Sequence, residues 1–505
     1  MTDYDYVVVG GGSAGCVLAS RLSEDPAARV LLLEAGPAQL PEATEVPAAW
    51  PSLLGSAADW GSVTVPQAEA GPVPYPHGRG LGGSGAINAM AHVRGHRAVY
   101  DGWAAAGADG WGFDGLLPYF QRSEDAGHGR DAALRGTSGP IRVAPVPEAG
   151  RHPVARAFAE ALCAVGFPAT DDLSGRRQEG VAWPDLAIQD GRRVSPADAY
   201  LRPALGRANL TVMTGCLVTR LTIRDGRCGG AEYVRDGKSQ RARASAEVIV
   251  CAGAIGSPQL LLLSGIGPAA ELRDCGINVV ADLAGVGKHL QDHPYVMARY
   301  SSAAPLPPSG YNHGETYAAL RSPLAGDWPD LHLFPILLPL VPAGHQAPDG
   351  GFALVASAVG VASRGTVRLA SADPEAAPLI DPGFLAETAD LDRLEAGLGI
   401  IRRAAAGQAM ARLGISETGP GCEARDSAGL RDWIRHTVGS YWHPAGTCRI
   451  GTDDGAVTDP QLGVHGIAGL RVADASVMPA IPNAHPHATV LAIAEKAAAL
   501  ITGVP

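Results

Sequence analysis

Apolar runs and a helical pattern alternate at the start of the chain. Residues 4–9 and 30–33 are rich in β-branched and other apolar side chains, which is typical of strands buried on both faces. Between them, residues 13–23 carry apolar side chains at helical spacing. The pattern predicts a β-α-β unit, whose two strands we expect to lie parallel with a right-handed crossover.

Similar patterns recur along the rest of the chain, without a repeat of fixed period. Residues 35–80 are rich in Pro, Gly and Ala and predict an excursion with little regular structure. The most apolar stretch, residues 331–341, is interrupted by Pro335 and Pro339 and is too short to span a bilayer. The remaining predicted elements are helices at 153–165, 391–405 and 488–501, and strands within 210–223 and 232–250 around a turn at Asp225-Gly226.

Length and composition narrow the class of protein. A chain of 505 residues is long enough for several domain-sized units, and its 65 glycines predict many tight turns. The net charge of −11, without a basic stripe, argues against nucleic acid or an anionic membrane as a partner. Eight dispersed cysteines, none spaced C-x-x-C, predict neither a zinc site nor a disulfide framework. With no signal-peptide pattern at the start, we expect a cytoplasmic protein that holds no metal.

The first candidate for chemistry is the G-x-G-x-x-G turn at residues 10–15. It stands between a predicted strand and a predicted helix, so its backbone can approach a pyrophosphate at the helix N-terminus. Glu34 ends the next strand, where a carboxylate accepts hydrogen bonds from an adenosine ribose. Together they predict a dinucleotide site, whereas the competing interpretation is a glycine-rich turn with a surface Glu. This motif alone does not distinguish FAD from NAD.

Two further glycine-rich segments extend the pattern. Residues 77–88 hold five glycines between Gly78 and Gly85 and predict a backbone bent around a phosphate or the polar edge of a flavin; a flexible loop is the alternative. Residues 253–267 follow a predicted strand, and we expect them to open a helix with Pro258 near its first turn and to end at Gly265.

These segments resemble the signatures of the glucose–methanol–choline (GMC) oxidoreductase family. Residues 77–92 match apart from His92, and 285–294 match a G-V-G-x-N-L-Q-D-H-P motif apart from His289 in place of Asn. Residues 459–496 fit the C-terminal region, so the resemblance covers essentially the whole chain. It implies an α/β fold, with a Rossmann-like FAD-binding domain and an α+β substrate domain containing an antiparallel sheet. The expected domains are 1–155, 207–295 and 437–505 for FAD, and 156–206 and 296–436 for the substrate.

The resemblance also turns a weak signal into a candidate catalytic pair. His443 precedes Pro444, and a His before a Pro is by itself usually a turn residue. In the family, however, the catalytic His stands at this place, and His suits acid–base work near neutral pH. A second catalytic His or Asn falls on His485, with His487 as the competing position. The helix predicted to follow would direct its N-terminus at the flavin and stabilise negative charge there.

The expected cofactor is FAD, held without a covalent bond because the position that carries a linking His in some family members looks like Ala86. The expected substrate contacts are His332, Phe334, Tyr441 and Trp442, for each of which ordinary packing is the alternative. The expected cofactor contacts are Gly10, Gly12, Ser13, Ala14, Gly15, Glu34, Ala35, Arg79, Gly82, Gly83, Ser84, Asn88, Ala89, Val218, Ala252, Gly253, Asp474, Ala475, His485, Pro486 and His487.

The implied reaction is oxidation of a primary alcohol, benzylic or furanic in type, to an aldehyde. His443 accepts the hydroxyl proton, His485 orients the hydroxyl, and FAD takes the hydride. Dioxygen or a quinone would reoxidise the flavin, and choline is not favoured over a neutral alcohol. The main alternative is a hydroxynitrile-type lyase, in which the flavin is not reduced. A non-catalytic flavoprotein and an NAD-linked dehydrogenase are less favoured, since both histidines are present and nothing resembles a nicotinamide site.

Overall fold

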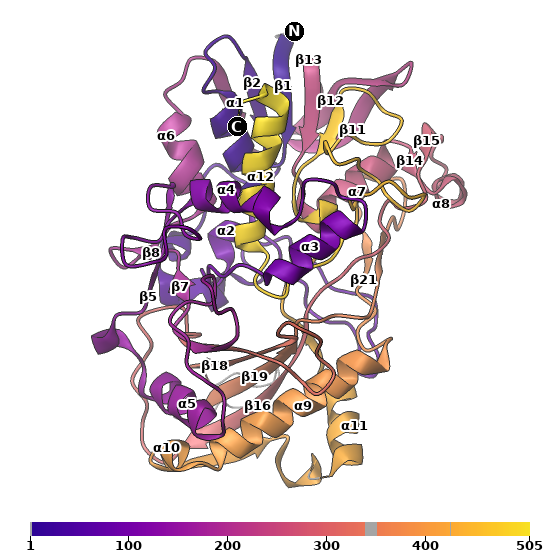
Figure 1. The fold of residues 1–505 in the computed structure, drawn as a ribbon. Coiled ribbons are helices and arrows are strands. Elements are labelled where there is room, and N and C mark those ends of the chain that lie inside the picture. The colour runs from indigo at the N-terminus through magenta and orange to yellow at the C-terminus, as the bar shows by residue number, and fades with distance from the viewer. Residues whose placement is uncertain (1–2, 339–350, 425, 505) are drawn as a thin grey trace.

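The computed structural model describes residues 3–338, 351–424 and 426–504. Within these residues two large sheets organise the chain, one toward each end of an elongated molecule, and both chain ends lie beside the first sheet (Figure 1). The mixture of parallel and antiparallel strands with helices confirms the predicted α/β class.

The first sheet is built around the predicted β-α-β unit. Strands β10, β2, β1 and β13 lie side by side in parallel, while β12 and β11 continue the sheet antiparallel and β24 pairs with β13. Their side chains form one large apolar core with the helices that flank them. The strands are β1 (Asp3–Val9), β2 (Val30–Leu33), β10 (Leu210–Met213), β11 (Leu217–Arg224), β12 (Arg227–Arg235), β13 (Lys238–Val250) and β24 (Leu470–Val472).

Helices α1 (Ser13–Leu22) and α12 (His487–Thr502) pack together beside this sheet (Figure 1). Helix α12 is apolar around nearly its whole circumference, which is typical of a helix buried on all sides, and it confirms the helix predicted at 488–501. Its one fully buried carboxylate, Glu495, is bonded by Arg21 and Tyr200. The N-terminus of α12 thereby has a fixed place next to the glycine turns.

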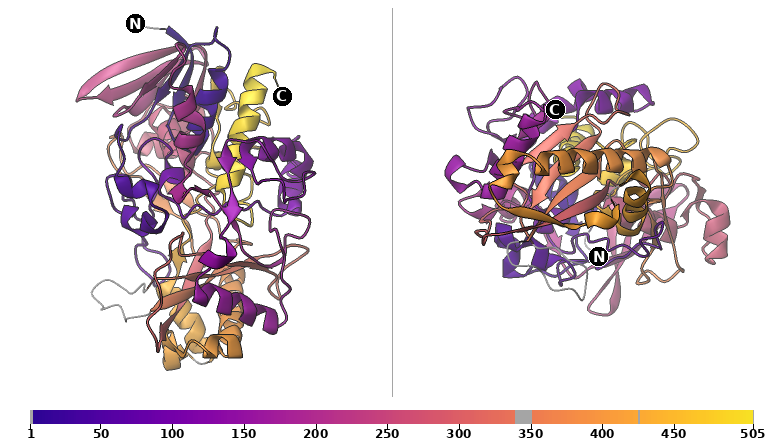
Figure 2. Two further views of the ribbon diagram at one scale, coloured as in Figure 1. Left: turned by 90° about the vertical axis from the view of Figure 1, so that its left-hand side faces the viewer. Right: turned by 90° about the horizontal axis from the view of Figure 1, so that it is seen from below.

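The second sheet is largely antiparallel, as predicted. Its order is β22-β16-β19-β18-β17-β6, with β23 paired to β16. Helix α9 (Thr388–Ala405) lies across its outer face, supported by α5 (Pro153–Ala164) and α11 (Ser427–Thr437) (Figure 2). The strands are β6 (Gly180–Ala182), β16 (Pro294–Ser302), β17 (Tyr317–Leu320), β18 (Leu331–Ile336), β19 (Phe352–Ala358), β22 (Ile415–Gly419) and β23 (Gly439–Ser440).

The smaller elements connect the two sheets. The proline-rich excursion holds two short 3-10 helices, Glu42–Glu45 and Pro47–Leu53, and otherwise runs without regular structure, close to the prediction. The other elements are α2 (Ser84–Ile87), α3 (Arg97–Ala105), α4 (Phe113–Ser123), α6 (Arg202–Ala204), α7 (Gly253–Leu263), α8 (Ala269–Asp274), α10 (Gln408–Ala411), β3 (Glu124–Asp125), β4 (Ile141–Arg142), β5 (Ala144–Pro145), β7 (Asp185–Leu186), β8 (Ile188–Gln189), β9 (Arg192–Arg193), β14 (Ile266–Gly267), β15 (Ala281–Asp282), β20 (Thr366–Arg368) and β21 (Leu379–Asp381).

The apolar stretch at 331–341 begins as strand β18, and its residues 339–341 lie outside the described residues. Strand β17 pairs with β18 only as far as Leu333. Pro335 lies beyond this pairing, so its missing N–H leaves no β17 carbonyl without a hydrogen bond, and the proline is tolerated. Among the described residues, no helix has the length and hydropathy needed to cross a membrane. The predicted residue boundaries of the two domains stay a prediction.

Candidate active site

The glycine turn after β1 opens onto a cavity of about 780 Å³. A Cβ at Gly15 would lie 1.9 Å from the carbonyl oxygen of Gly10, so this glycine permits the close contact of helix and strand. A Cβ at Gly12 would meet its nearest atoms only at 3.9 Å and beyond. The backbone at Gly12 therefore leaves room for a group placed at the N-terminus of α1.

Glu34 follows β2 and lies at the same end of the cavity. Its carboxylate oxygens accept hydrogen bonds from the backbone N–H groups of Gly11 and Gly36, both at 2.7 Å. Burial raises the pKa of Glu34. The side chain thus holds the glycine turn in shape, and it also lines the cavity where an adenosine ribose would lie.

The second glycine turn follows β13 and departs from the prediction in one respect. Helix α7 begins at Gly253, so Pro258 lies in the helix interior and not near its first turn. A proline there removes the backbone hydrogen bond to the carbonyl four residues earlier, that of Ala254. The hydroxyl of Thr447 donates to this carbonyl at 2.7 Å and replaces the missing bond. The sequence could not reveal this compensation because Thr447 is remote along the chain.

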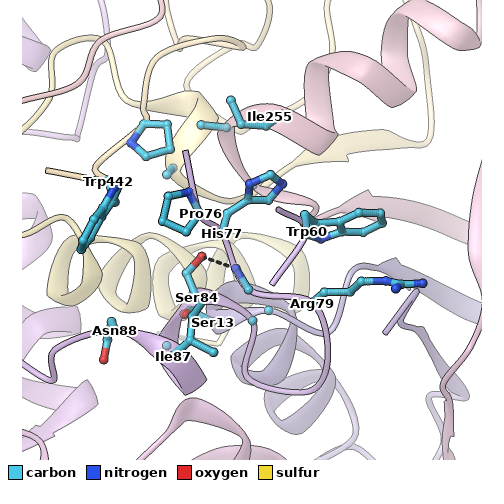
Figure 3. A pocket seen from close by; sticks show the side chains of 18 of the residues that line it. Ser13, Trp60, Pro76, His77, Arg79, Ser84, Ile87, Asn88, Ile255 and Trp442 are labelled. Atoms are coloured by element: carbon cyan, nitrogen blue, oxygen red, sulfur yellow. Dashed lines mark hydrogen bonds between the residues drawn. The ribbon is translucent and has the colours of Figure 1, made fainter. Parts of the chain in front are cut away.

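The third glycine-rich segment curves back on itself beside the other two. The hydroxyl of Ser84 accepts a hydrogen bond from the N–H of Gly78 at 3.1 Å (Figure 3). Arg79 lies over the ring of Trp60, 5.1 Å from its centroid. Asn88, which ends α2, presents its side chain to the cavity (Figure 3).

Most of the predicted site residues line this cavity. Gly15 and Gly82 do not, because they support the turns, and neither does His332, which is buried on β18 with its ring 5.9 Å from that of His485. The predicted residues in the lining are Gly10, Gly12, Ser13, Ala14, Glu34, Ala35, Arg79, Gly83, Ser84, Asn88, Ala89, Val218, Ala252, Gly253, Phe334, Tyr441, Trp442, His443, Asp474, Ala475, His485, Pro486 and His487.

The two predicted catalytic histidines meet in this cavity. The rings of His443 and His485 are edge to face, with centroids 5.2 Å apart. Nδ1 of His443 lies 2.9 Å from Nδ1 of His293, which follows directly on Asp292. Asp292 in turn accepts the backbone N–H of His443 at 2.8 Å. Within the described chain, Nε2 of His443 has no hydrogen-bond partner, so its lone pair or proton is available to a ligand.

His485 is held through Nε2, whereas His443 is held through Nδ1. Its Nε2 lies 2.9 Å from the hydroxyl of Tyr441, which is 3.4 Å from the hydroxyl of Tyr317. The His485 ring packs against the His443 ring, whereas His487 contributes to the cavity lining at the first residue of α12. This geometry supports His485 over His487 as the second catalytic residue, an assignment that remains a proposal.

Burial keeps these imidazoles neutral. It lowers the pKa of His443, His485 and His293 well below the usual value, and neighbouring imidazoles lower the pKa of each further. Burial also lowers the pKa of His332 to about 4. The buried Asp292 has its pKa raised to about 6. The cluster therefore presents unprotonated bases at neutral pH.

Aromatic side chains form a wall beside the histidine pair. Phe334 stacks on Tyr317 with centroids 5.0 Å apart and planes 19° apart, and on Tyr441 at 5.0 Å and 15°. Trp442 meets Trp50 edge to face at 6.0 Å. Sequence reasoning missed several lining residues because strand and loop positions without a motif gave no signal: Trp50, Tyr295, Asn312, His313, Tyr317, Ile336 and Val355. It quoted His293 within a motif but gave it no role.

The residues present fit FAD. The cavity joins the glycine turns and Glu34 to the histidine pair, the span expected of a dinucleotide whose ring reaches the catalytic end. The open backbone at Gly12 leaves room for the pyrophosphate.

Known proteins share this architecture along the whole chain. Two family models described as GMC oxidoreductase match residues 4–295 and 361–494. The chain is 38% identical to mitochondrial choline dehydrogenase of Homo sapiens, over 100% of this chain and 90% of that protein. It is 37% identical to oxygen-dependent choline dehydrogenase of Photobacterium profundum, over 99% and 93%.

Solved structures agree with the sequence comparisons. Pyridoxine 4-oxidase of Mesorbium loti superposes with a TM-score of 0.94 at 37% identity, covering 98% of each chain. A fungal aryl-alcohol oxidase superposes with a TM-score of 0.85 at 27% identity, covering 100% of this chain and 99% of the other. The chain belongs to the GMC oxidoreductase family and has FAD as its cofactor.

Proposed function

We propose that this oxidoreductase converts a primary alcohol of benzylic or furanic type to the aldehyde. His443 accepts the hydroxyl proton, and His485 orients the hydroxyl. The observation that carries the proposal is which nitrogen each ring leaves without a partner among the described residues: Nε2 for His443, which is held through Nδ1, and Nδ1 for His485, which is bonded through Nε2 to Tyr441. Among the described residues, Nε2 of His443 therefore has no protein partner and stays available to a ligand in the cavity.

The His293 contact favours this protonation state. When Nδ1–H of His443 donates to Nδ1 of His293, the lone pair on Nε2 is free to take a proton. After the transfer, the same hydrogen bond is charge-assisted and stabilises the imidazolium. His293 acts on His443 as the carboxylate acts in a Ser-His-Asp triad, but as a neutral partner. The buried carboxylate of Asp292 adds negative charge nearby.

His485 and its partners fix where the hydroxyl lies. The neutral ring of His485, oriented by Tyr441, packs edge to face against His443 and would border the alcohol oxygen placed beside Nε2 of His443. When bound, FAD supplies the acceptor for the hydride that leaves the carbinol carbon. Loss of the O–H proton to His443 and of the hydride balances the oxidation of an alcohol to an aldehyde.

The aromatic wall supports a planar substrate. A ring placed against Tyr441 would continue the stack formed with Phe334 and Tyr317. Neither His443 nor His485 forms an ion pair with a carboxylate among the described residues. The names of an aryl-alcohol oxidase and a pyridoxine oxidase agree with a planar alcohol, whereas the choline dehydrogenases make choline the necessary comparison.

The cofactor is proposed to be non-covalent, because neither Ala86 nor any other residue from Ser84 to Ala89 is a His. Acid precipitation should then release all the flavin into the supernatant. Dioxygen and a quinone remain the two proposed acceptors.

The test is anaerobic stopped-flow mixing with a panel of alcohols. Benzyl alcohol, furfuryl alcohol and choline would be compared by the rate of flavin bleaching, followed by mixing with dioxygen or a soluble quinone. We expect the planar alcohols to bleach the flavin faster than choline. Faster bleaching by choline would overturn the substrate class. A flavin spectrum unchanged by every alcohol, together with cleavage of a hydroxynitrile, would overturn the oxidation and favour the lyase alternative, which the named relatives do not support.

A further inference from the structure

Arg193 is a buried cation beside the cavity. It stands on the short strand β9 and is 5% exposed. Its Nε donates to the carbonyl of Thr44 at 2.7 Å, and its Nη1 donates to both the backbone and side-chain oxygens of Asn88, at 2.6 and 2.8 Å. Its Nη2 has no partner among the described residues.

This arrangement lacks a counter-ion. Arg193 forms no ion pair in the described part of the chain, although a buried Arg is almost always paired. The neighbouring Asp198 is instead bonded to Arg202 and Ser195. Burial lowers the pKa of Arg193 to about 10, although the nearby charge of Asp198 opposes the shift, so Arg193 stays charged at neutral pH. A buried, unpaired charge destabilises the folded protein unless a negatively charged group lies close to it.

Asn88 connects the guanidinium to the cavity. Its side-chain oxygen accepts hydrogen bonds from Nη1 of Arg193 and from the N–H of Met90 at 2.9 Å. Two donors on one atom assign that atom as oxygen, so the amide NH₂ is the group left over. It has no protein partner in the part of the chain that the structure describes, and Asn88 lines the cavity (Figure 3). The amide is therefore held as a donor toward a ligand, polarised by the charge behind it.

We propose that Arg193 is a positioning residue that, through Asn88, stabilises the negative charge gained by the flavin ring on reduction. The reduced cofactor would then supply the ion-pair partner that Arg193 lacks among the described residues. The inference depends on FAD binding and not on the identity of the alcohol, so failure of the proposed alcohol chemistry leaves it standing. A neutral side chain at position 193 should weaken binding of reduced FAD more than of oxidised FAD.

The test measures the two-electron reduction potential of the bound flavin against a reference dye. In Arg193→Met we expect the ratio of reduced to oxidised FAD affinity to fall about tenfold, the value of one charge-assisted hydrogen bond, which lowers the potential by about 30 mV. The affinity for inorganic sulfite, which adds negative charge to oxidised flavin, should fall in parallel. Arg193→Lys keeps the positive charge but loses the planar guanidinium with its several N–H donors, and it should give a potential between those of the wild type and Arg193→Met.

Two further variants separate this role from a structural one. Arg192→Met alters the exposed neighbour on the same strand, which pairs with Glu45, and should leave the potential unchanged. Asn88→Ala should lower the potential by itself, and adding Arg193→Met to it should bring little further change. An unchanged potential in Arg193→Met, or a loss confined to oxidised FAD affinity, would overturn the proposal. If Arg193→Met does not fold, an unchanged potential in Asn88→Ala overturns it.

Discussion

Replacing His293 tests how the base is prepared. In His293→Ala, Nδ1 of His443 loses the one side-chain partner that it has among the described residues, in a buried site. A hydrogen bond to a charged group contributes about 1.5–3 kcal/mol, so the imidazolium formed during proton transfer would be less stable by that amount. Since about 1.4 kcal/mol corresponds to a factor of ten in rate, flavin reduction should slow roughly 10- to 150-fold.

A matched variant separates this effect from simple loss of packing. His293→Asn places an amide oxygen near the position of Nδ1 and can still accept from His443, so it should recover most of the rate. The assay is anaerobic flavin bleaching by saturating alcohol, with FAD content and thermal stability measured for each variant. The reasoning is refuted if His293→Ala reduces its flavin at the wild-type rate, or if the Asn variant is as slow as the Ala variant at equal stability.

The other predictions concern contacts around the same site. Tyr441→Phe keeps the aromatic stack but removes the hydroxyl from His485, so kcat/KM should fall roughly two- to tenfold through loss of one neutral hydrogen bond; no change would exclude that contact from function. Thr447→Val leaves the carbonyl of Ala254 without a donor and should lower stability by about 1–3 kcal/mol, seen as a lower denaturant midpoint, whereas an unchanged midpoint would contradict the compensation at Pro258. Flavin reduction should be independent of pH above about 6.5, since the lowered pKa keeps His443 unprotonated there. Below that pH the unfolded chain takes up protons on His293, His332, His443 and His485 while the folded chain does not. The stability from these four groups is therefore present above it and lost on acidification, and protonation of Asp292 near pH 6 in the folded chain offsets only one of them; a stability that rises between pH 6.5 and 5 would contradict this.

The sequence predicted the glycine turns, which the structure places around the cavity. Glycine turns at strand ends are local features, because a turn that needs close backbone approach requires glycines within a few consecutive residues, and these are visible in the sequence. Glu34 and the helix at 488–501 were predicted for the same reason. The position of Pro258 in α7 was mistaken, since the hydroxyl that compensates for it comes from Thr447, far away in the sequence.

The catalytic end was predicted only where family resemblance marked a residue. His443 and His485 were found in this way. Tyr317 was not, because its part in the aromatic wall depends on how β17 and β18 pair. Arg193 gave no signal at all, since only the fold reveals that it is buried and that its Nη2 has no partner among the described residues. In both cases the surroundings of the side chain are decided by segments that are distant in the sequence, and the residue pattern of a single strand does not show which segments these are.

Flavin reduction in His443→Asn tests most directly whether His443 is the proton acceptor. This variant can keep a hydrogen bond to His293 while losing the Nε2 atom that would take the substrate proton. We predict normal FAD content and a rate of anaerobic bleaching by alcohol that is lower by about 10²- to 10⁴-fold, the range for removal of a general base. Bleaching at the wild-type rate would show that His443 is not the proton acceptor.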